Sequence, residues 1–119
     1  MKLIILIIIA IIMDATLHPA LAESDIKACI KFQRQDYSWS HAYAVRGFTI
    51  SGYDLNRFAR EKGYKAHYSS YSTYFIVPWD NGGYISLDIG SSYVPSYEKI
   101  VTDQNSINWK IKEGWNYCD

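Results

Sequence analysis

The feature of this sequence that most restricts its fold is a pair of cysteines. Cys29 and Cys118 are the only two cysteines, and they lie near opposite ends of the chain that follows an apolar leader. In an oxidising compartment, two thiols placed in this way are expected to pair with each other. Closing so long a loop stabilises a fold by roughly 4–5 kcal/mol in the chain-entropy treatment. A free thiol and an intermolecular bridge are the alternatives.

The first residues predict that the chain is exported. Lys2 is followed by an unbroken apolar run over residues 3–13, and Asp14 ends this run. The run has the length of a signal-peptide hydrophobic region and falls short of the roughly 20 residues that span a bilayer as a helix. An uncleaved signal anchor with a short membrane span is the alternative.

The end of the leader predicts a cleavage site. The helix-breaking Pro19 precedes Ala20-Leu21-Ala22, which puts small residues at the two positions that a signal peptidase reads. We expect cleavage between Ala22 and Glu23. Residues 1–22 are therefore predicted to be a cleavable signal peptide, and residues 23–119 a single disulfide-closed domain that is secreted or periplasmic.

The charge of the chain is balanced. The sequence has 12 Lys and Arg against 12 Asp and Glu, and the leader contains one residue of each sign. Non-specific binding to nucleic acids or anionic membranes depends on a surplus of basic residues. We therefore expect no nucleic-acid partner, and no stable membrane insertion once the leader is removed.

The pattern of apolar residues predicts a small α+β domain. The single predicted helix covers residues 53–62, with Ser51 as its N-cap and Gly63 as its left-handed stop. Strands are predicted at residues 27–35, 41–50, 71–79, 84–89, 97–102 and 108–112. The order is thus β-β-α-β-β-β-β. We expect a small antiparallel sheet or an open barrel of about six strands, packed on one short helix.

Residues for catalysis are few. His41 and His67, the two histidines after the leader, could act as the acid–base pair of a nuclease-like hydrolase, with Arg46 or Arg57 as a helping cation. Polar or partly buried structural histidines are the alternative, and the more common one. The sequence lacks the usual metal-ligand spacings, the Gly-x-Ser-x-Gly motif and a phosphate-binding glycine loop. We expect no cofactor and no metal, and we favour a binding protein over an enzyme.

Aromatic residues are the one excess in the composition. The chain contains 11 Tyr, 4 Trp and 4 Phe, all after the predicted cleavage site. So small a domain cannot bury them all, and exposed Tyr and Trp are frequent in protein interfaces. Packed cross-strand ladders are the alternative. With the loops at 80–83 and 90–96, the predicted binding residues are Trp79, Asp80, Tyr84, Tyr93 and Tyr97.

These features predict an exported, non-enzymatic binding protein. Small disulfide-closed exported domains occur among periplasmic inhibitors and immunity proteins, an analogy of architecture that identifies no target. The expected partner is another protein or a glycan, and the sequence does not specify an oligomeric state. A small secreted hydrolase that uses His41 and His67 and an envelope-associated structural protein are the alternatives.

Overall fold

The computed structural model describes residues 21–61, 63, 67–79, 83–91 and 93–119. Within these residues, strands and a single helix follow one another in the predicted order β-β-α-β-β-β-β. The elements are β1 (Leu21–Phe32), β2 (Tyr43–Ser51), α2 (Gly52–Glu61), β3 (Thr73–Pro78), β4 (Tyr84–Asp88), β5 (Lys99–Thr102) and β6 (Asn108–Glu113). The predicted α+β class is confirmed.

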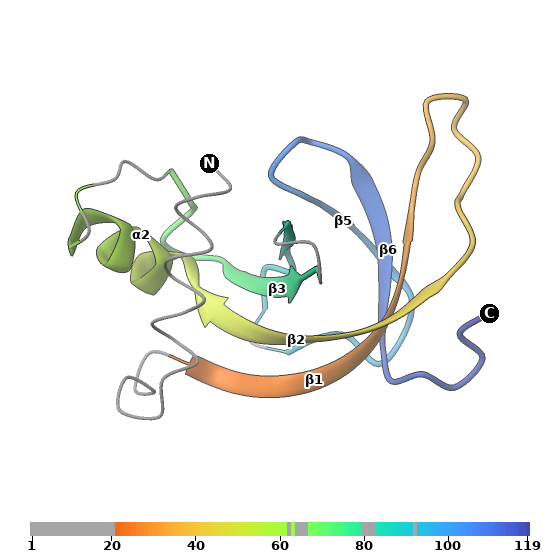
Figure 1. The fold of residues 1–119 in the computed structure, drawn as a ribbon, viewed down its shortest axis with the longest axis horizontal. Helices are drawn as coiled ribbons and strands as arrows, with labels where there is room; N and C mark the ends of the chain where they lie inside the picture. Colours follow the sequence, from red (N-terminus) through yellow and green to blue (C-terminus); the bar gives the residue numbers. More distant parts are fainter. Residues whose placement is uncertain (1–20, 62, 64–66, 80–82, 92) are drawn as a thin grey trace.

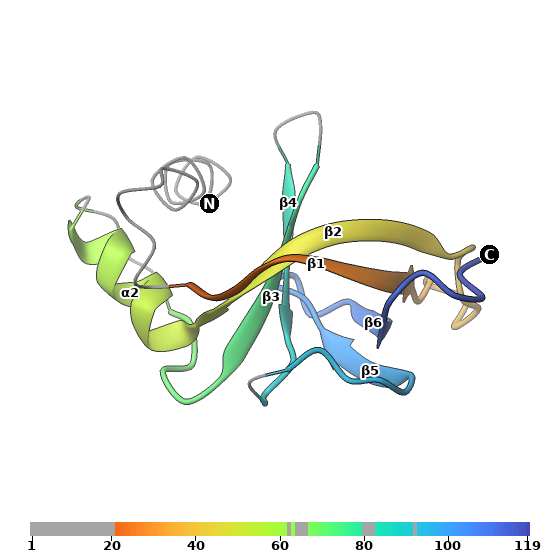
Figure 2. The ribbon, with the colours of Figure 1, turned by 90° about the horizontal axis from the view of Figure 1, so that it is seen from below.

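The strands form one antiparallel sheet that curls into a nearly closed barrel. Their order in the sheet is β4-β3-β2-β1-β6-β5, and every neighbouring pair is antiparallel. The long strands β1 and β2 curve along the molecule (Figure 1). The β3–β4 hairpin stands across these two strands, while β5 and β6 lie on the other side of β1 (Figure 2). Of the two architectures that the sequence allowed, the chain adopts the barrel.

Inward side chains fill the inside of the barrel. Ala28 and Ile30 of β1 are fully buried, and Phe75, Leu87 and Ile111 meet them from β3, β4 and β6. These residues alternate along their strands with residues that point outward, because successive side chains of a strand lie on opposite faces of the sheet. The predicted alternation of residues 27–35 thus places one face of β1 in the core.

Helix α2 packs on the outside of the barrel. The hydroxyl of Ser51 accepts a hydrogen bond from the Asp54 N–H (3.0 Å), which is the predicted N-cap. Gly63 has a φ of 79°, the predicted left-handed stop. The apolar face of the helix joins the outer face of β2 and β3 in a second cluster, made of Phe48, Ile50, Leu55, Phe58, Ala59, Tyr74 and Ile76.

A side chain bridges the two edge strands of the barrel. Gln104 lies in the β5–β6 turn, and its Oε1 accepts a hydrogen bond from the Ser86 N–H (3.0 Å). Its Nε2 donates to the carbonyl of Tyr84 (3.1 Å). Because the barrel is not fully closed, β4 has no neighbouring strand on this side. The Gln104 amide therefore supplies the hydrogen-bond partners for the backbone groups at the edge of β4.

Replacing Gln104 by Leu is expected to lower the free energy of unfolding by about 1–3 kcal/mol, because the Ser86 N–H and the Tyr84 carbonyl lose their partner. Asn105→Leu, a similar change at an exposed position of the same turn, is the control and should have little effect. Urea titrations of both variants measure the difference. Equal losses in the two variants would show that Gln104 does not close the barrel.

Strand β1 begins earlier than the predicted strand. Its register shifts between Leu21 and Glu23 and again between Glu23 and Ile26, and Asp25 has a φ of 57°. These irregularities interrupt the alternation of side chains, and therefore periodicity alone could not detect the first part of the strand. The predicted cleavage point after Ala22 lies within β1, and cleavage stays a prediction.

Cys29 and Cys118 form the predicted disulfide. Their Cα atoms are 5.5 Å apart, although 89 positions separate the two residues in the sequence. The bond joins the outward face of β1 to the C-terminal segment that follows β6. No helix in the described part of the chain is long and apolar enough to cross a membrane. Lys62, the predicted last residue of the helix, and residues 80–82 of the predicted hairpin turn lie outside the described residues.

Candidate binding surface

Three connections between paired strands share one end of the barrel. They are the β1–β2 connection (residues 33–42), the β3–β4 connection, of which the structure describes Trp79 and Gly83, and the β5–β6 turn (residues 103–107). We call the described residues of these connections the hairpin end. The Gln33 N–H donates to the carbonyl of Asn108 (2.9 Å), and Gln104 binds β4. Figure 1 shows the first and third connections at the top of the molecule. Hydrogen bonds therefore tie the β1–β2 connection to β6, and the β5–β6 turn to β4.

A cluster of rings occupies the hairpin end. It consists of Phe32, His41, Tyr43, Trp79 and Trp109, and we call it the ring cluster. Phe32 pairs directly with Trp109 across the sheet, with ring centroids 5.5 Å apart. Tyr43 lies 6.3 Å from the Phe32 ring, 6.4 Å from that of Trp79 and 4.3 Å from that of His41. Trp109 is buried and His41 is exposed, while the other three rings of the cluster are partly buried. The cluster therefore runs from the core to the surface.

Asp103 fixes both the buried ring and the turn beside it. Its Oδ2 accepts a hydrogen bond from Nε1 of Trp109 (2.9 Å). Its Oδ1 accepts hydrogen bonds from the N–H groups of Asn105 (2.8 Å) and Ile107 (3.0 Å). One carboxylate thus shapes the β5–β6 turn and orients the indole that supports the ring cluster.

The β1–β2 connection is also tied by side chains. Asp36 accepts hydrogen bonds from the hydroxyl and the N–H of Ser38, and these bonds lower the pKa of its carboxyl group. The Arg34 guanidinium donates to the carbonyl of Trp39 (2.6 Å), and the buried Ser40 hydroxyl accepts from the Phe32 N–H (3.0 Å). This ordered connection holds His41 beside Tyr43.

The five predicted binding residues do not form one site. Trp79 belongs to the ring cluster, and Asp80 lies outside the described residues. Tyr93 and Tyr97 are exposed, at 73% and 68%, but they lie in the β4–β5 connection at the opposite end of the barrel. Tyr84 is only 6% exposed, and its side chain faces the α2 side of β4. Of the four predicted binding residues that the structure describes, Trp79 lies at the hairpin end and the other three do not.

Tyr84 belongs to a group of buried and partly buried phenols beside helix α2. Tyr68 is held through its backbone by Asn56 of the helix, and its hydroxyl interacts with the side chains of Ser86 and Tyr84. Burial raises the pKa of Tyr68 far above its ordinary value of 10.0, and the nearby Tyr84 adds to this shift. Burial also raises the pKa of Tyr74 and of Tyr84. Tyr74 and Tyr84 are buried and Tyr68 is partly buried, so these phenols contribute to packing beside helix α2.

The buried phenols predict a loss of stability in alkali. Folding raises the pKa of Tyr68, so the unfolded chain loses this proton at a lower pH than the folded one. The contribution of Tyr68 to the free energy of unfolding is therefore complete below pH 10 and is lost as the pH rises above 10. We expect Tyr68→Phe to weaken the dependence of the unfolding free energy on pH between about 9 and 11. Tyr71→Phe, at a fully exposed phenol, is the control and should keep the wild-type dependence. Identical pH profiles for the two variants would show that folding does not raise the pKa of Tyr68.

The two histidines proposed as an acid–base pair lie apart. His41 precedes β2 at the hairpin end, whereas His67 is exposed and precedes Tyr68, which binds helix α2 beyond the other end of β2. A nine-residue strand such as β2 spans about 30 Å when straight. Arg46, one of the two predicted helping cations, forms an ion pair with Asp25 (3.0 Å). The described structure thus does not bring the predicted catalytic residues together.

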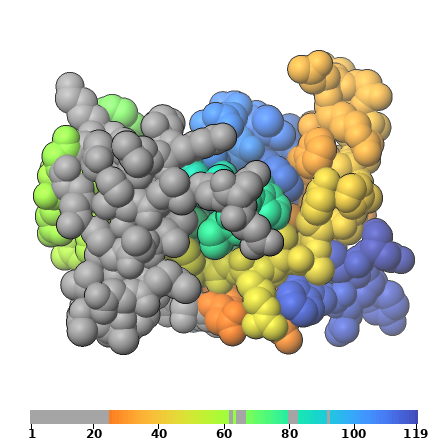
Figure 3. Space-filling view, viewed as in Figure 1, coloured from red at the N-terminus to blue at the C-terminus, as the bar shows by residue number. Residues whose placement is uncertain are grey.

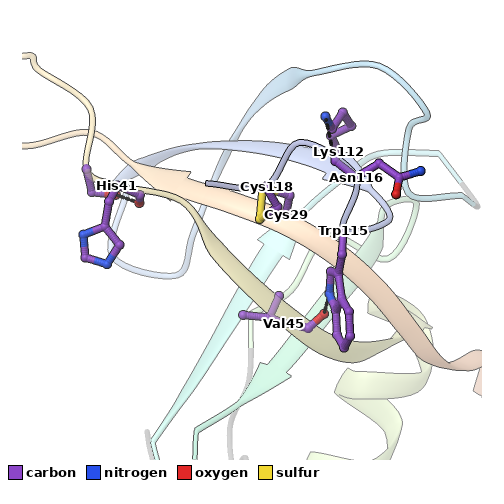
Figure 4. The surroundings of a disulfide bond; sticks show 8 residues. Cys29, His41, Val45, Lys112, Trp115, Asn116 and Cys118 are labelled. Atoms are coloured by element: carbon purple, nitrogen blue, oxygen red, sulfur yellow. Dashed lines mark hydrogen bonds between the residues drawn. A yellow bond between two sulfur atoms is a disulfide. The ribbon is translucent and has the colours of Figure 1, made fainter.

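The C-terminal segment lies on the outer face of β1 and β2, and Figure 3 shows its dark-blue atoms beside the yellow part of the chain that contains β2. Nε1 of Trp115 donates to the carbonyl of Val45 (3.0 Å), and its ring lies 4.8 Å from the Lys27 ammonium and 5.1 Å from the Arg46 guanidinium. Figure 4 shows Trp115 reaching Val45 on one side of the disulfide, with Lys112 and Asn116 beside it. Lys112 donates to the carbonyl of Asn116 (3.1 Å). The disulfide and the indole therefore attach this segment at two points.

Sequence reasoning missed Phe32, Tyr43 and Trp109 as members of a site. Each lies within a predicted strand, and the sequence indicates on which face of the strand its side chain lies. Their contacts, however, depend on which distant strands pair with one another. Among the described residues, no group of three or more His, Cys, Asp or Glu side chains could hold a metal ion. Comparison of the chain with family models, curated proteins and solved structures gave no match.

Proposed function

We propose that this chain is an exported, non-enzymatic binding protein of the inhibitor or immunity type that contacts a protein partner with its hairpin end. The observation that carries the proposal is the ring cluster, which runs from the barrel core to the surface at the hairpin end. Partly buried rings surrounded by polar turns are typical of the centres of protein interfaces.

The rigidity of the hairpin end supports this function. Trp109 is held by Asp103, and His41 is held by the ordered β1–β2 connection. Side chains that are fixed before binding lose little conformational entropy in the complex, and more of the contact energy then appears as affinity. A disulfide-closed barrel is a suitable scaffold for such a surface.

The contacts of Tyr43 favour a protein over a glycan as the partner. Three other rings contact Tyr43, and one of them, Phe32, is stacked on it with an interplanar angle of 19°. A sugar ring stacks on an open aromatic face, whereas protein interfaces use the edges and the mixed polar surface of such a cluster. No comparable feature among the described residues favours a hydrolase, because His41 and His67 lie at different ends of β2.

The two exposed histidines provide a matched test. His41→Asp changes the surface of the hairpin end, and His67→Asp makes the same chemical change beyond the other end of β2. We expect a partner protein captured by the wild-type chain to be retained by His67→Asp and bound at least about tenfold more weakly by His41→Asp. Equal capture by all three proteins would exclude the hairpin end. A hydrolytic activity lost in both variants would establish the enzyme instead.

A further inference from the structure

Cations gather on the outer face of β2, β1 and β6. Lys27 and Lys31 alternate along β1 with the buried Ala28 and Ile30, and they therefore point outward. The register places Arg46 opposite Lys27, Lys112 opposite Cys29 and Lys110 opposite Lys31. We call the outward set the basic face: Lys27, Lys31, Arg46, Lys110 and Lys112.

The basic face contains two directly opposed like-charge pairs, Lys27 with Arg46 and Lys31 with Lys110. Like charges at directly opposite positions of a sheet destabilise it. An indole lies beside each pair: Trp115 contacts Lys27 and Arg46, and the Trp39 ring lies 4.5 Å from the Lys110 ammonium. The indoles hold the cations in place without neutralising their charge.

Carboxylates offset only part of this charge. Asp25 pairs with Arg46 (3.0 Å) and Glu98 pairs with Lys110 (3.6 Å). Asp119 adds a third carboxylate near this face, because it follows Cys118, which is bonded to Cys29 of β1. Because the whole chain is neutral, a basic surplus on this face means that the opposite charge lies elsewhere on the molecule.

The basic face continues into the hairpin end. The link is Trp39 of the β1–β2 connection, whose ring lies 4.5 Å from the Lys110 ammonium, whereas Phe32 and Trp109 point into the barrel. The neighbouring Ile100 is paired with Lys110 and is 57% exposed. The outward surface at the hairpin end therefore presents the Trp39 indole, an aliphatic side chain and ammonium groups together, a combination that suits a folded protein partner.

We propose that the basic face, and Lys31 and Lys110 above all, binds an acidic surface of the partner protein. The inference rests on the proposed function and adds the chemical character of the partner. Complementary charge beside an apolar contact accelerates association and selects among partners. The neutral charge of the whole chain disfavours a nucleic acid, because binding along a phosphate backbone depends on a surplus of basic residues.

The test uses poly-L-glutamate as the acidic probe, with a single-stranded DNA oligomer and phosphatidylglycerol-containing vesicles for comparison. Lys31→Glu is compared with Arg60→Glu, the same change of charge at an exposed position of α2. We expect Lys31→Glu to weaken poly-L-glutamate binding at low salt by about tenfold, and Arg60→Glu to change it less than about twofold. Equal losses in the two variants, or tighter wild-type binding to DNA or vesicles, would overturn the inference.

Thermal stability provides a second measurement. Lys31→Glu converts the Lys31–Lys110 pair into an opposite-charge pair, and we expect its Tm to equal or exceed that of the wild type. Lost binding without lost stability separates recognition from a structural role, and a large fall in Tm would contradict the recognition role.

The captured partner separates the two proposals. A protein that needs His41 but binds Lys31→Glu as well as it binds the wild type would overturn the basic-face inference and leave the proposed function standing. Binding of poly-L-glutamate through Lys31, without any partner that depends on His41, would overturn the proposed function alone.

Discussion

Replacing both Cys29 and Cys118 by Ser is expected to lower the free energy of unfolding by about 4–5 kcal/mol, because the bond closes a loop between residues 89 positions apart. In a domain of this size, such a loss lowers Tm by roughly 20 °C or more. A small domain of this kind has only about 5–10 kcal/mol of stability in total. We therefore expect the double variant to be largely unfolded near 37 °C.

Trp115→Ala in the oxidised chain is the control for the disulfide. This change removes the hydrogen bond to Val45 and the contacts with Lys27 and Arg46, but it keeps the cross-link. We expect a smaller loss of about 1–2 kcal/mol. Urea titrations followed by tryptophan fluorescence measure both proteins. If removing the disulfide lowered the free energy of unfolding no more than Trp115→Ala does, the bond would only attach the C-terminal segment to the barrel.

Adding one methyl group at Gly47 is expected to have the second large effect. A Cβ at this position of β2 would overlap the carbonyl oxygen of Ile76 and come within 2.7 Å of the Phe75 ring. Phe75 is fully buried, and the carbonyl belongs to the backbone of β3, so neither neighbour can move away without cost. We expect Gly47→Ala to reduce the free energy of unfolding by about 3 kcal/mol or more.

Gly90→Ala is the matched control for this substitution. Gly90 has a φ of +73°, and nothing lies within 4 Å of the position of its Cβ. The added methyl therefore meets only backbone strain, which costs about 1 kcal/mol. Denaturant titration should separate the two variants clearly. Similar losses would show that β2 and β3 do not approach each other as closely at Gly47 as described.

The features that could be predicted from the sequence are local ones. The Ser51 cap, the apolar face of the helix with Leu55 and Phe58, and the stop at Gly63 are encoded within a few residues of one another. The order of strands and helix along the chain follows from the same periodicity, whereas the order of the strands in the sheet does not. Pro78, expected at the end of a strand because it has no N–H, is the last residue of β3.

The closure of the barrel and the ring cluster could not be predicted in this way. Gln104 reaches β4 only because the sheet curls, and Phe32 meets Trp109 only because β1 pairs with β6. Tyr84 was expected in a binding surface, but its position in β4 points its side chain toward the α2 side of the sheet. There it is buried and interacts with Tyr68. Composition likewise shows the neutral total charge and not the basic face.

Hydrogen exchange of the chain, alone and in complex with its captured partner, tests the account most directly. If the hairpin end is the binding surface, peptides that cover residues 33–43 and 103–109 should exchange more slowly in the complex, and those that cover residues 53–61 and 67–72 should not change. Protection confined to helix α2 and the segment after it would contradict the assignment of the binding surface.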